Sequence, residues 1–243
     1  GVPAWVLATS ALRRLDQALD PAFQAAALNS LGLALVAAVV TVAAGAVVAY
    51  ALRIRHDRGA RLAASIASIG YAVPGTVLAV GILVPLAQLD NAVDGFARAT
   101  FGVSTGLILA GSGFGLVYAY LVRFLTIPLG TVEAGINKLS PHLEMASRTL
   151  GRTATETLAL IHLPLLRPAL TTAALIVFVD TMKELPATVL LRPFNFDTLA
   201  TTVFAAASRE HFEESALAAL AIVAVGLVPV ILLARASGRT RRR

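Results

Sequence analysis

Five long runs of apolar residues, separated by short polar stretches, constrain the fold of this 243-residue chain. A helix needs about 20 predominantly apolar residues to cross a bilayer, and each run is long enough. Only 14% of the residues are charged, whereas soluble domains carry about 25%, so the chain cannot cover a water-facing surface. The sequence therefore predicts an all-α, polytopic transmembrane helix bundle with about five full spans. The predicted spans are residues 27–52, 62–89, 105–129, 169–191 and 215–234.

Residues 1–12 are apolar but too short to cross a bilayer. We interpret them as part of a further, incomplete first span or as an interfacial segment. A short helix lying on the membrane is expected within residues 198–208, which follow the fourth run.

The second run contains Pro74 and Gly75 near its middle. Proline removes a backbone donor and glycine loosens the helix, so we expect a kink or break inside the membrane. Arg123 lies in the last turns of the third run, and we expect its side chain to reach the cytoplasmic interface. The polar residues expected in an outside loop between these runs are Asp90, Asp94 and Arg98.

Residues 144–168 form the longest moderately polar stretch between two strongly apolar runs. Good helix formers fill residues 144–150, and Gly151 follows where a helix C-terminus favours a residue with positive φ. A second helix is expected over residues 153–163, where Pro164 interrupts it. The pattern predicts a rigid helix–Gly–helix elbow, about residues 139–166, suited to docking on something outside the membrane.

The spacing of this elbow resembles the signature of permease subunits of binding-protein-dependent ABC importers. That signature reads Glu-Ala-Ala, three residues, Gly, nine residues, then Ile-x-Leu-Pro. Met145 occupies the glutamate position here, and Glu144 lies one residue early. This departs from the family pattern, so a contact made by the family's glutamate carboxylate is not expected at position 145. The alternative is an ordinary amphipathic cytoplasmic loop. The residues that the resemblance assigns to coupling with an ATPase are Glu144, Met145, Ala146, Gly151, Ile161, Leu163 and Pro164.

The fourth run carries Asp180, Lys183 and Glu184, which share overlapping faces of one helical turn if the helix is continuous. Charges inside a span are costly and should face a bundle interior, a wet cavity or a partner chain. Pro186 frees a backbone carbonyl nearby. Two interpretations stay open: a polar gate on the substrate path, to which Pro74 and Gly75 also belong, or an ion pair of Lys183 with one carboxylate that locks helices together.

The stretches KELPATVLLRPFNFDTLATTVF (residues 183–204) and YAVPGTVLAVG (residues 71–81) are similar to the corresponding stretches of the ferric-iron class of these permeases. In that class two halves are fused in one polypeptide, and this chain, which does not begin with Met, resembles the second half. Residues 1–243 are thus expected to be a single permease domain excerpted from a longer chain. The resemblance implies three partners: cytoplasmic ATP-binding subunits, a periplasmic substrate-binding protein and the other permease half.

The basic residues cluster at the ends of the apolar runs, which is the orientation signal of membrane proteins rather than a nucleic-acid-binding face, despite the net charge of +6. Placing residues 53–61, the elbow and the C-terminal tail on one side gathers most of the basic residues there. We therefore predict a multi-pass protein of the bacterial inner membrane, in contact with lipid and without a nucleic-acid partner, whose elbow and tail are cytoplasmic.

The sequence contains no P-loop pattern, so ATP hydrolysis is expected in a partner and the chain is not expected to be an enzyme. It has no cysteine, and its four histidines are dispersed and expected at interfaces or in loops. No metal site or cofactor is predicted. Two alternatives to ferric-iron import remain: an ABC importer permease for another small ion or a polyamine, and a secondary transporter that uses the charges of the fourth run as ion-coupling groups.

Overall fold

The computed structural model describes residues 2–54, 57–140 and 142–240. The regular elements of these residues are all helices, which confirms the all-α prediction. The helices are α1 (Val2–Arg13), α2 (Pro21–Ile54), α3 (Arg58–Ala67), α4 (Gly75–Phe101), α5 (Gly113–Phe124), α6 (Thr126–Ile136), α7 (His142–Thr149), α8 (Ala154–Thr157), α9 (Leu163–Met182), α10 (Pro186–Leu191), α11 (Leu199–Ala207) and α12 (Phe212–Thr240).

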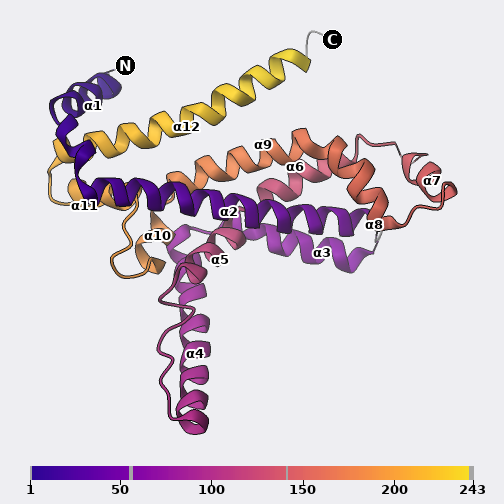
Figure 1. The fold of residues 1–243 in the computed structure, drawn as a ribbon, viewed down its shortest axis with the longest axis horizontal. Coiled ribbons are helices and arrows are strands. Elements are labelled where there is room, and N and C mark those ends of the chain that lie inside the picture. Colours follow the sequence, from indigo (N-terminus) through magenta and orange to yellow (C-terminus); the bar gives the residue numbers. More distant parts are fainter. Residues whose placement is uncertain (1, 55–56, 141, 241–243) are drawn as a thin grey trace.

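Helices α2, α6 and α9 pack against one another along the long axis of the molecule, and α12 lies beside α9 (Figure 1). Small residues make this close packing possible in a chain with few large buried side chains. At Gly45 of α2, an added Cβ would lie 2.7 Å from the Pro128 ring of α6. The contact between α2 and α6 therefore requires glycine at this position.

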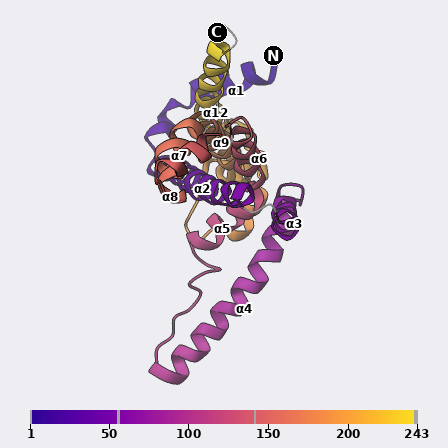
Figure 2. The same cartoon turned by 90° about the vertical axis from the view of Figure 1, so that its right-hand side faces the viewer.

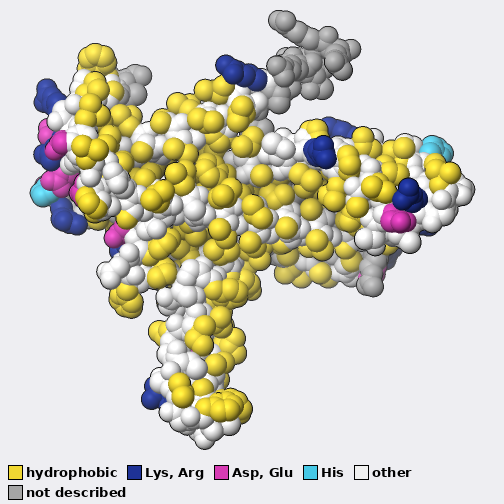
Figure 3. All heavy atoms as spheres, in the orientation of Figure 1, with side chains coloured by type: hydrophobic (Ala, Val, Ile, Leu, Met, Phe, Trp, Pro, Cys, Tyr) yellow, Lys and Arg dark blue, Asp and Glu magenta, His cyan; other side chains and the backbone are white. Residues whose placement is uncertain are grey.

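Four described helices are long and apolar enough to cross a membrane, and α5 with α6, bent by 48°, makes a fifth candidate when the pair is counted as one span. This agrees with the five spans predicted. On the face shown in Figure 3, apolar side chains cover most of the middle of the molecule, whereas most of the charged side chains lie toward its two ends. The chain is a multi-pass membrane protein by this pattern.

The second predicted span is not one helix. Helix α3 ends at Ala67, a 3₁₀ turn covers Ser68–Tyr71, and Pro74 precedes α4, which leaves the bundle in a different direction in both views (Figures 1 and 2). The expected break at Pro74 and Gly75 is confirmed, but the predicted boundary at residue 89 is wrong, because α4 continues to Phe101.

The predicted outside loop at Asp90, Asp94 and Arg98 is also wrong, because these residues lie in α4. The irregular chain comes later, at residues 103–112, where the third span was expected to begin. Asp90 is buried and accepts hydrogen bonds from the backbone N–H groups of residues 108–110 at 2.7–3.2 Å. Asp94 accepts hydrogen bonds from the backbone N–H groups of residues 105 and 106 and pairs with Arg98 at 2.6 Å. Two carboxylates one turn apart thus fasten the returning chain to α4.

The fourth predicted span is divided as well. Helix α9 ends at Met182 and α10 starts at Pro186, so the charged residues lie at a helix end rather than within a continuous helix. The short helix expected within residues 198–208 is present as α11. Its Leu199 is buried with Ala26 of α2 and Ala218 of α12, so α11 packs into the bundle. Residues 1–12 were expected to be part of an incomplete span or an interfacial segment. Of these, residues 2–12 lie in α1, which packs against α12.

Candidate functional site

The elbow has the helix–Gly–helix geometry that the sequence predicts. Gly151 has φ of +75°, in the left-handed region that favours glycine. Its N–H bonds to the carbonyl of Arg148 at 3.0 Å, and the N–H of Arg152 bonds to the carbonyl of Ser147 at 3.1 Å. This pair of bonds is a Schellman motif, which ends α7 and turns the chain.

The chain after Gly151 starts its next helix with a capping box. The Glu156 carboxylate accepts the N–H of Thr153 at 2.8 Å, and the Thr153 hydroxyl accepts the N–H of Glu156 at 3.3 Å. Across the turn, the hydroxyls of Ser147 and Thr157 are hydrogen-bonded at 2.7 Å, and both residues are buried. The two arms of the elbow are therefore fixed to each other by side chains as well as by the turn.

The surface of the elbow exposes apolar side chains. Met145 is 53% exposed and Leu150 is 81% exposed. Ala146, Leu163 and Pro164 are exposed too, and Ile161 is half-buried. The side chain of Glu144 lies outside the described residues. Exposed apolar side chains on a small rigid unit are suited to contact with a partner.

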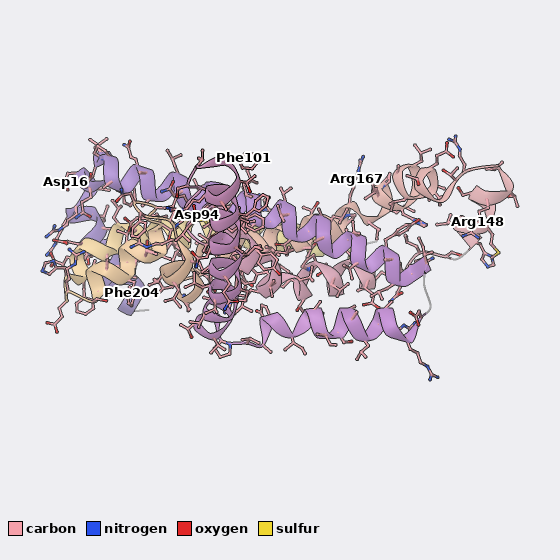
Figure 4. All side chains as sticks on the ribbon, turned by 90° about the horizontal axis from the view of Figure 1, so that it is seen from below. Asp16, Asp94, Phe101, Arg148, Arg167 and Phe204 are labelled. Atoms are coloured by element: carbon pink, nitrogen blue, oxygen red, sulfur yellow. The ribbon has the colours of Figure 1, made fainter. Side chains whose placement is uncertain are left out.

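The elbow lies at one end of the molecule, where the labelled Arg148 is far from Asp16 at the opposite end (Figures 1 and 4). Part of the basic stretch at residues 53–61, and Arg241–Arg243 of the tail, lie outside the described residues. The predicted side of the membrane for the elbow and the tail stays a prediction.

Pro164 does not interrupt the helix, contrary to the prediction. Residues Leu158–His162 form a π-helical segment, in which the N–H of Leu163 bonds to the carbonyl of Leu158. The wider turn accommodates the proline at the start of α9 without ending the helix. As a result, residues Thr155–Met182 form one helix of 28 residues that joins the elbow directly to the break in the fourth run.

The three charges of the fourth run do not form one cluster. Lys183 pairs with Asp180 at 2.9 Å, but within the same helical turn, and Lys183 is 62% exposed. This pair therefore does not lock two helices together. Glu184 points elsewhere, because α9 ends at Met182 and the backbone changes direction there.

Glu184 instead pairs with Arg123 of α5, at 3.1 Å between Oε2 and Nε. Arg123 also donates from Nη1 to the carbonyl of Val73 at 3.0 Å. The expected snorkelling of Arg123 is thus wrong: its side chain is 19% exposed and that of Glu184 7%. At this short distance and away from bulk water, the opposite charges of the guanidinium and the carboxylate attract each other strongly. The sequence does hold a clue to this pairing. Lys183 can pair fully with only one of the carboxylates of Asp180 and Glu184, so the other carboxylate needs a cation from another span, here Arg123.

One histidine lies elsewhere than the sequence predicts. His162 is buried, with its ring 5.7 Å from that of Tyr50 in an edge-to-face contact, rather than at an interface or in a loop. Among the described residues, no three His, Cys, Asp or Glu side chains gather as they would around a metal ion.

No protein-family model matches the chain. The Fe(3+)-transport system permease protein FbpB 2 of Haemophilus influenzae is 28% identical over 163 residues, which are 67% of this chain and 29% of that protein. The trehalose transport system permease protein SugB of Mycobacterium tuberculosis is 29% identical over 67% of this chain and 53% of its own length. The putative 2-aminoethylphosphonate transport system permease protein PhnV of Salmonella paratyphi A is 25% identical over 94% of this chain and 80% of its own length.

Among solved structures, a chain of a bacterial alginate ABC transporter, in complex with an alginate-bound periplasmic protein, superposes with a TM-score of 0.72. The match covers 99% of this chain and 88% of that one at 14% identity. The fold is that of an ABC transporter permease. In sequence, the chain is similar to permease proteins of transport systems with different substrates, so the comparisons support a permease but not ferric iron in particular.

The chain spans less than a third of the ferric permease and about half of the trehalose permease that it matches. The comparisons give no support to the expected fusion of two permease halves, which stays a prediction.

Proposed function

We propose that this chain is the transmembrane permease domain of an ATP-driven ABC importer, which couples ATP hydrolysis by partner subunits to substrate passage across the inner membrane. The observation that carries the proposal is the elbow: a turn closed by a Schellman motif, with exposed apolar side chains, at one end of a bundle with the permease fold. ATP-binding subunits dock on this elbow, because the sequence has no P-loop of its own.

The continuous helix Thr155–Met182 carries movement from the elbow into the bundle. It ends at the break before Pro186, and the break at Pro74 lies next to it through the contact of α4 with α10. Displacement of the elbow by the ATPase shifts these breaks and opens or closes the substrate path. The residues proposed for the gate are Pro74, Gly75, Asp180, Lys183, Glu184 and Pro186.

The proposed orientation places the elbow in the cytoplasm and residues 192–198 outside. The absence of cysteine makes the chain suited to single-cysteine labelling. Leu150→Cys and Phe194→Cys report on the two ends, since these side chains are 81% and 97% exposed. A membrane-impermeant maleimide should label the Phe194→Cys variant in intact cells and the Leu150→Cys variant only after permeabilisation. The reverse pattern would contradict the orientation.

Ferric iron is the proposed substrate, because the chain is similar to ferric permeases and carries the ferric-type stretches at residues 71–81 and 183–204. A phosphonate is the second candidate, since the match to PhnV extends over 94% of the chain. A periplasmic binding protein would deliver either substrate, and a second permease half would complete the path.

The test is uptake into proteoliposomes that contain the assembled complex, with the binding protein in the outer medium and ATP in the lumen. ATP-dependent uptake of ferric iron that persists with a proton ionophore supports the proposal. Uptake that needs no ATP and stops with the ionophore would identify a secondary transporter instead. ATP-dependent uptake of 2-aminoethylphosphonate but not iron would keep the class and change the substrate.

A further inference from the structure

Two helix breaks that are far apart in the sequence meet at one ion pair, in which Glu184 is buried and Arg123 is half-buried. The first break lies at residues 72–74, before α4, and the second at residues 183–185, between α9 and α10. Arg123 of α5 reaches both: its Nη1 donates to the carbonyl of Val73, and its Nε lies 3.1 Å from Glu184 Oε2.

The carboxylate of Glu184 also makes contact with the start of α10. Glu184 Oε1 accepts a hydrogen bond from the N–H of Ala187 at 3.2 Å, and the backbone carbonyl of Glu184 accepts one from the Thr188 hydroxyl at 2.6 Å. Thr188 in turn is 2.5 Å from the hydroxyl of Tyr120, one turn before Arg123 on α5. The second break is therefore held to α5 by two side-chain contacts.

The first break also lies close to the ion pair of Arg123 and Glu184. A Cβ at Gly75 would lie 2.9 Å from Glu184 Oε1 and 3.2 Å from Arg123 Nη1. It would also lie 3.1 Å from the Cβ of Pro186. The backbone of α4 thus begins in direct contact with the ion pair and with the first residue of α10, so neither break can shift freely without the other.

We propose that Arg123 and Glu184 are positioning residues that form a latch, which makes the two helix breaks move as one unit. This inference rests on the proposed function, because the movement it transmits is that of the elbow along α9. The Asp180–Lys183 pair differs in kind: it lies within one helical turn and connects no second element. The latch keeps α4 and α10 in a fixed relation in every state of the transporter.

The test measures the distance between α4 and α10 in the assembled complex in lipid nanodiscs. Val77→Cys and Leu190→Cys take nitroxide labels, since both side chains are exposed and the chain has no other cysteine. With Arg123 and Glu184 intact, we expect one narrow distance distribution that is the same without nucleotide and with bound ATP. Glu184→Gln should broaden it, make it shift between the two states and lower transport per ATP several-fold.

The double variant Arg123→Gln with Glu184→Gln separates positioning from folding. It leaves no unpaired buried charge, so the yield of assembled complex should recover relative to either single change. The distance distribution should nevertheless stay broad. A narrow distribution in the double variant would show that the pair only stabilises the fold and would overturn the latch, as would a broad distribution in the unmodified protein.

Arg98→Gln is the matched control, because it removes an exposed ion pair at the far end of the same helix, α4. It should leave the distance distribution narrow; the same broadening there would overturn the latch. Lack of ATP-driven import by the unmodified complex would refute the proposed function instead, and the width of the distribution without nucleotide would still decide whether the latch exists.

Discussion

Replacement of Gly151 should weaken the attachment of the ATPase in a graded way. Gly151 has φ of +75°, and a Cβ added there meets nothing within 4 Å. The cost of Gly151→Ala is therefore backbone strain alone, about 1–2 kcal/mol for an L-residue in the left-handed region. Asparagine tolerates this region better, so Gly151→Asn should cost less, whereas Gly151→Pro cannot adopt a positive φ and also loses the bond to Arg148.

The strain affects docking because the turn holds the two arms of the elbow in one arrangement. If the alanine variant relaxes to a negative φ, the Schellman bonds break and α7 moves away from α8. A cost of about 1–2 kcal/mol lowers the ratio of docking-competent to relaxed elbow by a factor of roughly 5–30. The affinity of the purified permease for its ATPase subunit should fall by up to this factor, because it scales with the fraction of competent elbow. Titration of labelled ATPase onto nanodiscs measures the loss.

Gly130→Ala is the matched control for this series. A Cβ added at Gly130 also has no atom within 4 Å, but Gly130 lies inside α6 and does not have a positive φ. Alanine is favoured over glycine inside a helix by about 1 kcal/mol, so ATPase affinity should be unchanged. Equal affinity of the Gly151→Ala and unmodified proteins, or an equal loss with Gly130→Ala, would refute the reasoning.

Four further substitutions probe three other contacts. Met145→Ala should weaken ATP-driven transport several-fold, because it removes an exposed apolar side chain of the elbow; full activity would show that this position makes no coupling contact. Asp90→Asn should speed hydrogen exchange of the backbone amides at residues 108–110, since each hydrogen bond to a charged acceptor contributes about 1.5–3 kcal/mol. Lys183→Met and Asp180→Asn should have less than additive effects on thermal unfolding of the complex, and additive effects would contradict the pairing seen at 2.9 Å.

The sequence predicts the number of candidate spans and the turn of the elbow because both depend on local signals. The number of spans follows from runs of about 20 apolar residues. The turn at Gly151 follows from helix formers that end at a residue able to adopt a positive φ. In each case the physical cause lies within a few residues of the feature, so no knowledge of the tertiary structure is needed.

Local signals do not predict the direction of α4 or the continuation of the helix through Pro164. Pro74 and Gly75 indicate a break, but the angle after a break depends on what packs on either side. Asp90 looked like a loop residue because a charge after an apolar run is typical of an interface, yet it is buried by backbone amides 18–20 residues later. Pro164 is accommodated by a π-helical segment, which no composition rule predicts.

The pairing of Arg123 with Glu184 was missed because the two residues lie on different spans, but its position has a physical logic. Breaks within a span leave backbone groups without their helical partners, and lipid offers no water to satisfy them. Here Arg123 takes up the carbonyl of Val73, and Glu184 takes up the N–H of Ala187. The two side chains thus bond to backbone groups at the breaks, and their opposite charges form an ion pair. A charge within an apolar run therefore indicates a break in that helix, and its partner is to be sought beside the break in another span.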